Sequence, residues 1–194
     1  MDQASLKSSD ALLVVDVQND FCPGGALAVE GGDRVVPVLN RWIKAAEAAG
    51  TRIIASRDWH PAGHVSFHEQ GGPWPPHCVE HTPGAEFHAA LALPQNVQIV
   101  SKGTNLQKEA YSAFEGTDLA ERLKQQAVQR FWIGGLTLEY CVCQTTLDGL
   151  RMGFQVHVLL DATRAINANP GDDRRALDEI RRAGAVFEGE LDHE

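Results

Sequence analysis

The sequence contains few cysteines, few basic residues and no long apolar run, and each shortage excludes a class of protein. Its four cysteines, Cys22, Cys78, Cys141 and Cys143, form neither a C-x-x-C pair nor a dense disulfide pattern. We therefore expect them to remain thiols in a reducing compartment, without a disulfide between Cys22 and Cys78. A small secreted scaffold held together by disulfides is excluded.

Basic residues are outnumbered, with 17 Lys and Arg against 26 Asp and Glu and a formal charge of −9. Such a balance argues against a nucleic-acid-binding surface, so the expected partner is a small molecule. The sequence has no apolar run long enough to span a bilayer and no charged-then-apolar leader. We expect a cytoplasmic protein, either a monomer or a homo-oligomer, that binds neither nucleic acid nor membranes.

Short apolar runs alternate with helical patterns along the 194 residues. The apolar runs predict strands over 11–16, 51–57, 97–101, 129–134, 154–161 and 185–188. Helices are expected from an Asp33 cap to Gly50, over 118–126, after Cys141, and from Asp172 to Gly184. This alternation predicts a single-domain α/β fold over 1–194, with three layers, a six-stranded, mostly parallel, Rossmann-like sheet and helices on both faces.

The segment 58–95 breaks this pattern. It holds six of the eight histidines and six of the nine prolines, without a helical or strand period. Long loops inside compact domains are either functional or disordered. Because the segment also contains Trp59, Phe67, Trp74 and Phe87, disorder is the weaker interpretation. We expect an ordered, functional loop.

Cys141 is the first candidate for chemistry. The stretch Phe131–Gly153 predicts a strand, a sharp turn at Gly134 and Gly135, and a helix, and ligands usually bind at such turns. Near a helix N-terminus, unpaired N–H groups and the helix dipole favour a thiolate. The alternative is a cysteine that packs as a small buried hydrophobe. Cys143, two residues on, would point roughly 200° away, toward the core or a neighbouring strand.

Asp16 and Lys102 follow two other apolar strands, so a parallel sheet brings both to the same edge as Cys141. Asp16 can act as a general base for the thiol, and Lys102 can stabilise the thiolate. Backbone N–H groups in the turn 136–141 could form an oxyanion hole. Together these groups suit acyl transfer without histidine, although an ordinary strand-end ion pair is the alternative for Asp16 and Lys102.

Asp58 and His60 project to the same side if the strand continues through them. A third ligand from the loop would complete an open site of the kind found in catalytic zinc proteins. His77, held by the rigid W-P-P-H-C context, is the favoured third ligand and His64 the second choice; the others are His68, His81 and His88. This ligand set suits Zn, Fe or Mn, and plain surface histidines are the alternative.

Six motifs occur in a fixed order along almost the whole chain. They are D-V-Q-N-D-F (16–21), R-D-W-H-P (57–61), W-P-P-H-C-V (74–79), S-K-G-T (101–104), A-Y-S-A-F (110–114) and L-E-Y-C-V (138–142). Together they resemble the nicotinamidase branch of the isochorismatase-like cysteine hydrolases. The resemblance implies an isochorismatase-like fold and hydrolysis of nicotinamide to nicotinate and ammonia through a cysteine thioester, in NAD salvage. It also implies activity on pyrazinamide.

The resemblance assigns roles to residues already singled out. Cys141 would be the nucleophile, Asp16 the base and Lys102 the third member of the triad. The backbone amides of Thr137 and Cys141 would form the oxyanion hole, after a cis peptide bond between Leu136 and Thr137.

The resemblance also implies one divalent metal ion, zinc in preference to iron or manganese, that holds the pyridine nitrogen of the substrate. Asp58, His60 and His77 would be its ligands, and His64 is a candidate fourth ligand. Phe21, Trp74 and Tyr111 would line the substrate pocket, where flat rings pack against the pyridine.

Two alternatives stay open. The first is another hydrolase of the superfamily, an isochorismatase or an N-carbamoyl amidase, which would generally lack the metal ligands. The second is a non-catalytic binding protein that keeps the fold. Metal analysis of the purified protein tests the first alternative, and the alkylation rate of Cys141 tests the second.

Overall fold

Six parallel strands form the centre of the computed structural model, which describes residues 6–191. The strands are β1 (Asp10–Val15), β2 (Arg52–Asp58), β3 (Gln98–Lys102), β4 (Arg130–Leu136), β5 (Gln155–Arg164) and β6 (Val186–Glu188). They lie in the order β3-β2-β1-β4-β5-β6, and every neighbouring pair is parallel. The winding direction reverses between β1 and β4, which is where ligands bind in doubly wound sheets.

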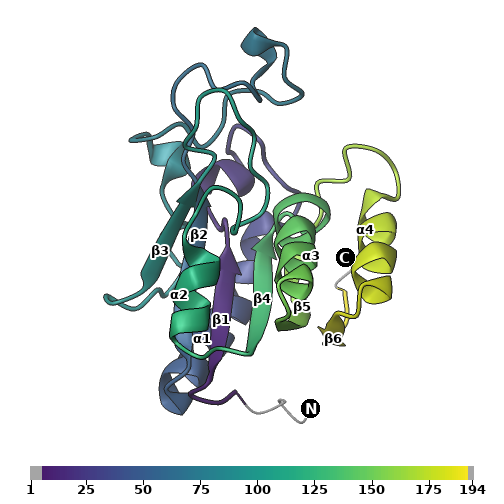
Figure 1. Cartoon of the computed structure of the whole chain (residues 1–194). Helices are drawn as coiled ribbons and strands as arrows, with labels where there is room; N and C mark the ends of the chain where they lie inside the picture. Colours follow the sequence, from purple (N-terminus) through teal and green to yellow (C-terminus); the bar gives the residue numbers. More distant parts are fainter. Residues whose placement is uncertain (1–5, 192–194) are drawn as a thin grey trace.

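Four helices cover the two faces of this sheet: α1 (Val35–Ala49), α2 (Leu119–Gln125), α3 (Cys143–Arg151) and α4 (Asp172–Arg182). α1 packs on one face, and α2, α3 and α4 pack on the other (Figure 1). The six residues of β1 are buried on both faces, which explains why that strand reads as a continuous apolar run. The predicted α/β fold is confirmed.

The start of α1 differs from the prediction. Gly32–Arg34 forms a 3-10 turn, and α1 begins only at Val35, without a side-chain cap from the described residues. The predicted Asp33 cap is therefore wrong, because Gly31, at φ +62°, lets the chain enter the helix through this tight turn. The end of the helix is as predicted, with Gly50 in the left-handed conformation.

The connection from β4 to α3 also differs from a simple strand, turn and helix. Leu138–Val142 forms one π-helical turn, so Cys141 precedes α3 by two residues. The Leu136–Thr137 peptide bond is cis, as predicted. At Gly135 a Cβ would lie 2.0 Å from the carbonyl oxygen of Val15, so a side chain there would separate β4 from β1.

The long loop after β2 stands above the carboxyl edge of the sheet (Figure 1). Its regular structure consists of two 3-10 turns, His68–Gln70 and Pro83–Ala85, and of isolated bridges such as Phe67 with Trp74. The expectation of an ordered loop without helical or strand periodicity is confirmed. All four cysteines are buried and free in this structure.

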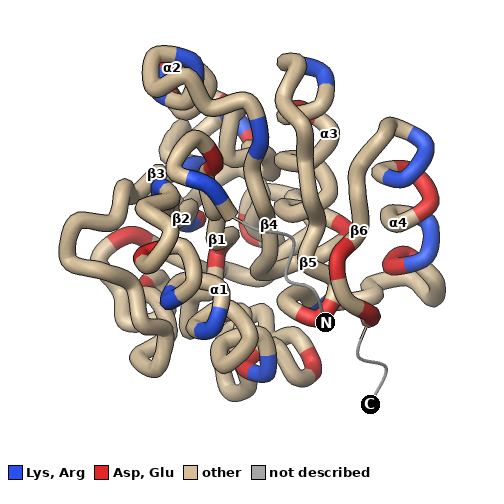
Figure 2. Tube along the Cα trace, turned by 90° about the horizontal axis from the view of Figure 1, so that it is seen from below, with Lys and Arg blue, Asp and Glu red and all other residues tan. Residues whose placement is uncertain are grey.

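Charges of both signs are interspersed on the surface, most clearly along α4 (Figure 2). Ion pairs Arg175–Asp172 and Arg182–Asp178 lie on that helix. None of the helices within residues 6–191 combines the length and the apolarity that crossing a bilayer requires.

Candidate active site

Lys102 lies at the centre of the carboxyl edge of the sheet. Its Nζ is 2.9 Å from Asp16 Oδ2 and 3.3 Å from Cys141 Sγ, and it also donates to Asp58 Oδ1. Burial alone would lower the pKa of Lys102, but the two carboxylates raise it well above its ordinary value. The structure therefore brings Asp16, Lys102 and Cys141 together around a permanent positive charge.

The strand ends account for this convergence. Asp16 directly follows β1, whereas Asp58 and Lys102 are the last residues of β2 and β3 and are paired in register. Cys141 comes from the turn after β4. Because all four strands run in the same direction, the four side chains meet at one edge.

Asp16 is completely buried, and its Oδ1 accepts a hydrogen bond of 2.7 Å from Ser56 Oγ. Burial raises the pKa of Asp16, although Lys102 and Ser56 act in the opposite direction. A carboxylate with a raised pKa is better able to hold a proton during a reaction. Asp16 is therefore suited to general acid–base chemistry.

The Cys141 sulfur is buried and lies two residues before α3. Burial raises the pKa of the Cys141 thiol well above its ordinary value, Lys102 acts in the opposite direction, and Asp16 and Asp58 act in the same direction as burial. A carboxylate oxygen of Asp16 lies within 4.8 Å of the sulfur. The thiol proton therefore has a carboxylate acceptor nearby.

Cys143 lies elsewhere in the core. Burial and the negative charge of Glu179, on α4, raise the pKa of Cys143 to about 12. The two cysteine side chains point in different directions, as predicted. Cys141 Sγ contacts Lys102, whereas the Cys143 thiol lies close enough to α4 for the charge of Glu179 to act on it.

Asp58, His60 and His77 form a second group beside Lys102. Asp58 Oδ2 is 3.7 Å from His60 Nε2 and 4.0 Å from His77 Nε2, and all three side chains are buried. The Nδ1 atoms face the carbonyl oxygens of Gly103 and Pro75, at 3.1 and 2.8 Å. Because a carbonyl oxygen only accepts, each Nδ1 carries the proton and each Nε2 keeps its lone pair for a metal ion.

His64 does not join this group. Its Nδ1 lies 2.8 Å from Ser66 Oγ and its Nε2 lies 3.1 Å from the carbonyl oxygen of Lys108. Its ring packs on that of His60 with centroids 4.3 Å apart, and its ligand atoms group with those of His60 and Glu109. Of the other histidines of this loop, His68 and His81 are exposed and His88 is half-buried.

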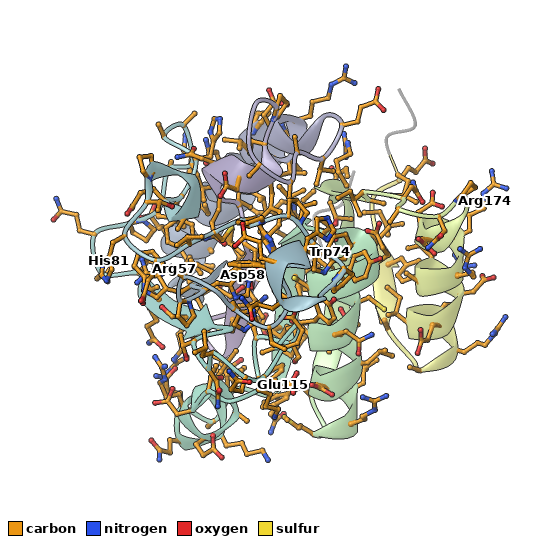
Figure 3. All side chains as sticks on the ribbon, turned by 90° about the horizontal axis from the view of Figure 1, so that it is seen from above. Arg57, Asp58, Trp74, His81, Glu115 and Arg174 are labelled. Carbon is orange, nitrogen blue, oxygen red and sulfur yellow. The ribbon has the colours of Figure 1, made fainter. Side chains whose placement is uncertain are left out.

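A cavity lined largely by aromatic side chains lies between the two groups. Phe21, Trp74 and Tyr111 line it as predicted, and Asp58, His77, Thr137 and Cys141 also reach it. Trp74 Nε1 donates to the hydroxyl of Tyr111 at 3.0 Å, which fixes two of the rings. Figure 3, seen from above the carboxyl edge, shows Asp58 near the middle of the molecule with Trp74 beside it.

Comparison with known families agrees with this geometry. A family model described as the isochorismatase domain matches residues 10–189. The chain belongs to the isochorismatase family. Within that family, the nicotinamidase of Escherichia coli K12 is 39% identical, over 91% of this chain and 93% of the relative.

Two solved structures are also similar to this chain. A pyrazinamidase of Pyrococcus horikoshii in complex with zinc superposes with a TM-score of 0.89 at 50% identity, over 93% of this chain and 98% of that chain. PnC1 from L. infantum, in complex with nicotinate, has a TM-score of 0.86 at 34% identity, over 95% of each chain. The resemblance to the nicotinamidase branch is confirmed.

Several residues of this isochorismatase-family site were not found from the sequence. Leu27, Tyr140 and Ile166 also line the cavity. Tyr140 could have been found because it precedes Cys141, but Leu27 and Ile166 come from loops without a pattern. Gln18 was also missed; its side-chain amide bonds both backbone groups of Asp58, at 2.7 and 2.8 Å, and so holds that residue in place.

Proposed function

We propose that this protein hydrolyses nicotinamide to nicotinate and ammonia, and pyrazinamide in the same way. The observation that carries the proposal is the position of Cys141 Sγ, 3.3 Å from Lys102 Nζ, at an aromatic cavity that Asp58 and His77 also line. Aromatic walls are suited to packing against a flat ring. The nicotinamidase and the nicotinate-bound relatives support this choice of substrate.

In the first half of the reaction, Cys141 Sγ attacks the carbonyl carbon of the amide while its proton passes to Asp16. The negative oxygen that forms would be bound by the backbone N–H groups of Thr137 and Cys141, each such donor typically contributing about 3 kcal/mol. Lys102 stays protonated throughout and holds the carboxylate of Asp16 in place. Asp16 then returns the proton to the departing nitrogen, the C–N bond breaks, and ammonia leaves a thioester on Cys141.

In the second half, a water molecule attacks the thioester. Asp16, again a carboxylate, takes a proton from this water, and the C–S bond breaks. The sulfur regains this proton from Asp16, and the acid is released. In solvent the acid ionises to nicotinate and ammonia takes up a proton, so the sum is amide plus water to carboxylate plus ammonium. Asp16 carries the proton in both halves.

The donor set of Asp58, His60 and His77 fits a divalent metal, because one carboxylate oxygen and two unprotonated imidazole nitrogens face each other in a buried place. We propose zinc, which the Pyrococcus horikoshii relative binds. When bound, the metal would supply a Lewis acid for the lone pair of the pyridine nitrogen. Phe21, Trp74 and Tyr111 would hold the ring so that its amide faces Cys141.

The test is ammonia release from nicotinamide by the purified protein. Cys141→Ala should abolish release, while the matched variant Cys143→Ala should keep most of it, because Cys143 does not line the cavity. The thioester should be trapped as a mass increase on Cys141 after an acid quench. The reverse pattern of activities would contradict the assignment of the nucleophile.

We infer that the reaction serves NAD salvage in the cytoplasm.

A further inference from the structure

Glu139 is the second residue of the turn that carries Cys141, yet its side chain does not line the cavity. Instead, Glu139 Oε1 accepts a hydrogen bond of 2.6 Å from the backbone N–H of Asn167. Asn167 belongs to the loop that leads from β5 to α4 and passes beside α3 (Figure 1). The carboxylate therefore joins two segments that follow neighbouring strands.

This contact continues the β4–β5 pairing beyond the sheet. The last paired residues of the two strands are Leu136 and Arg164. Glu139 and Asn167 each lie three residues further along, where the backbones no longer pair. A side chain thus replaces the backbone hydrogen bonds at the point where the two segments separate.

Both joined segments carry walls of the aromatic cavity. Thr137, Tyr140 and Cys141 come from the turn, and Ile166 comes from the loop directly before Asn167. Asn167 is also fixed from the other side, because its Oδ1 accepts a hydrogen bond of 3.1 Å from the backbone N–H of Asp173 in α4. The distance between Ile166 and the turn therefore depends on the Glu139 bond.

The Glu139 side chain is partly buried. Glu139 Oε2 and Thr137 Oγ1 are both buried and have no hydrogen-bond partner of ordinary geometry within residues 6–191. Burial raises the pKa of Glu139, while nearby backbone N–H groups and the Thr137 hydroxyl lower it. The carboxylate is therefore held by groups from both segments.

We propose that Glu139 is a positioning residue that sets the width of the cavity between Ile166 and the Cys141 turn, and thereby the ring size that the site accepts. This inference rests on the proposed hydrolysis of nicotinamide. Glu139 touches neither the substrate nor the reacting atoms. Its effect reaches the reaction through the position of Ile166.

The experiment compares nicotinamide with the bulkier 5-methylnicotinamide in wild type, Glu139→Ala and Glu139→Gln. The alanine variant should raise KM for nicotinamide about tenfold with a smaller change in kcat, and should lower the preference for nicotinamide over the methylated amide about tenfold. The glutamine variant should restore most of both values. Its carbonyl oxygen can accept from Asn167, and its amide can donate to Thr137 Oγ1.

Arg175→Ala is the matched control. Arg175 bonds the carbonyl oxygen of Pro170 in the same loop, at 3.2 Å, but does not line the cavity. Its removal should leave the ratio of the two amides unchanged. If Glu139→Ala lowers both activities equally, in step with a lower Tm, or leaves the ratio unchanged, the positioning role is wrong.

A wild type that releases no ammonia from nicotinamide would overturn the proposed function instead. The same variants are then compared by the quenching of tryptophan fluorescence on titration with nicotinate. A Kd raised about tenfold in Glu139→Ala and restored in Glu139→Gln supports the positioning role. Equal Kd values overturn it.

Discussion

Asp58 and Lys102 face each other in register across β2 and β3 and form a buried ion pair at the carboxyl edge of the sheet. One oxygen of Asp58 accepts from Lys102, and the other faces the imidazoles of His60 and His77. Burial would raise the pKa of Asp58, but the adjacent Lys102 ammonium lowers it below its ordinary value. A single ionised carboxylate thus connects the proposed catalytic and metal-binding groups.

The first prediction concerns Lys102→Met. Removing the ammonium leaves Asp16 and Asp58 buried without their cation, and breaking such a pair costs about 3–5 kcal/mol. We expect the free energy of unfolding, measured by urea titration, to fall by that amount and ammonia release to fall about a thousandfold or more. Lys108→Met is the control, because Lys108 is largely exposed in its pair with Glu115 and such pairs contribute about 0–1 kcal/mol. Equal losses in the two variants would refute the central role of Lys102.

The second prediction concerns the metal. Dialysis against a chelator should weaken nicotinate binding and reduce ammonia release, and zinc should restore both. His77→Asn should lower the zinc content of the purified protein, whereas His81→Asn should not, because His81 is exposed and outside the ligand group. A fully active preparation without metal would remove the metal from the proposal and favour another hydrolase of the family.

The third prediction concerns the pH dependence of the base. The Ser56 hydroxyl lowers the pKa of Asp16, so Ser56→Ala should raise that pKa beyond the increase that burial already causes. Because Asp16 must be ionised to accept the thiol proton, activity falls as pH drops through its pKa. The acidic limb of kcat/KM should therefore move to higher pH in the variant. Ser101→Ala, whose hydroxyl accepts from Arg57 rather than facing Asp16, should leave the limb in place.

The fold was predictable because parallel strands buried on both faces leave long apolar runs in the sequence. The run before Asp16 and the one before Lys102 ended within one residue of the observed strands. The exact entry into α1 was not predictable, since it depends on a left-handed Gly31 followed by a 3-10 turn rather than on a capping side chain. The π-helical turn that holds Cys141 left no periodic signal either.

The candidate site was predictable only in part. Strand ends indicated that Asp16, Lys102 and Cys141 would converge, but the contact between Asp58 and Lys102 depends on the register of β2 against β3, which spacing along the chain does not reveal. His64 shows the opposite case. Its position in the sequence made it a candidate ligand, whereas its ring nitrogens face Ser66 and the backbone at Lys108.

Gly135 makes no chemical contribution, yet the spacing between β1 and β4 depends on its missing side chain. Val15, which it touches, is followed directly by Asp16, and Gly135 is followed within six residues by Cys141. A methyl group at Gly135 would push β1 and β4 apart. Because Asp16 follows β1 and Cys141 follows β4, the proposed base and the sulfur would move apart as well. Substitution of an inert glycine should therefore look, in an activity assay, like the loss of a reactive group.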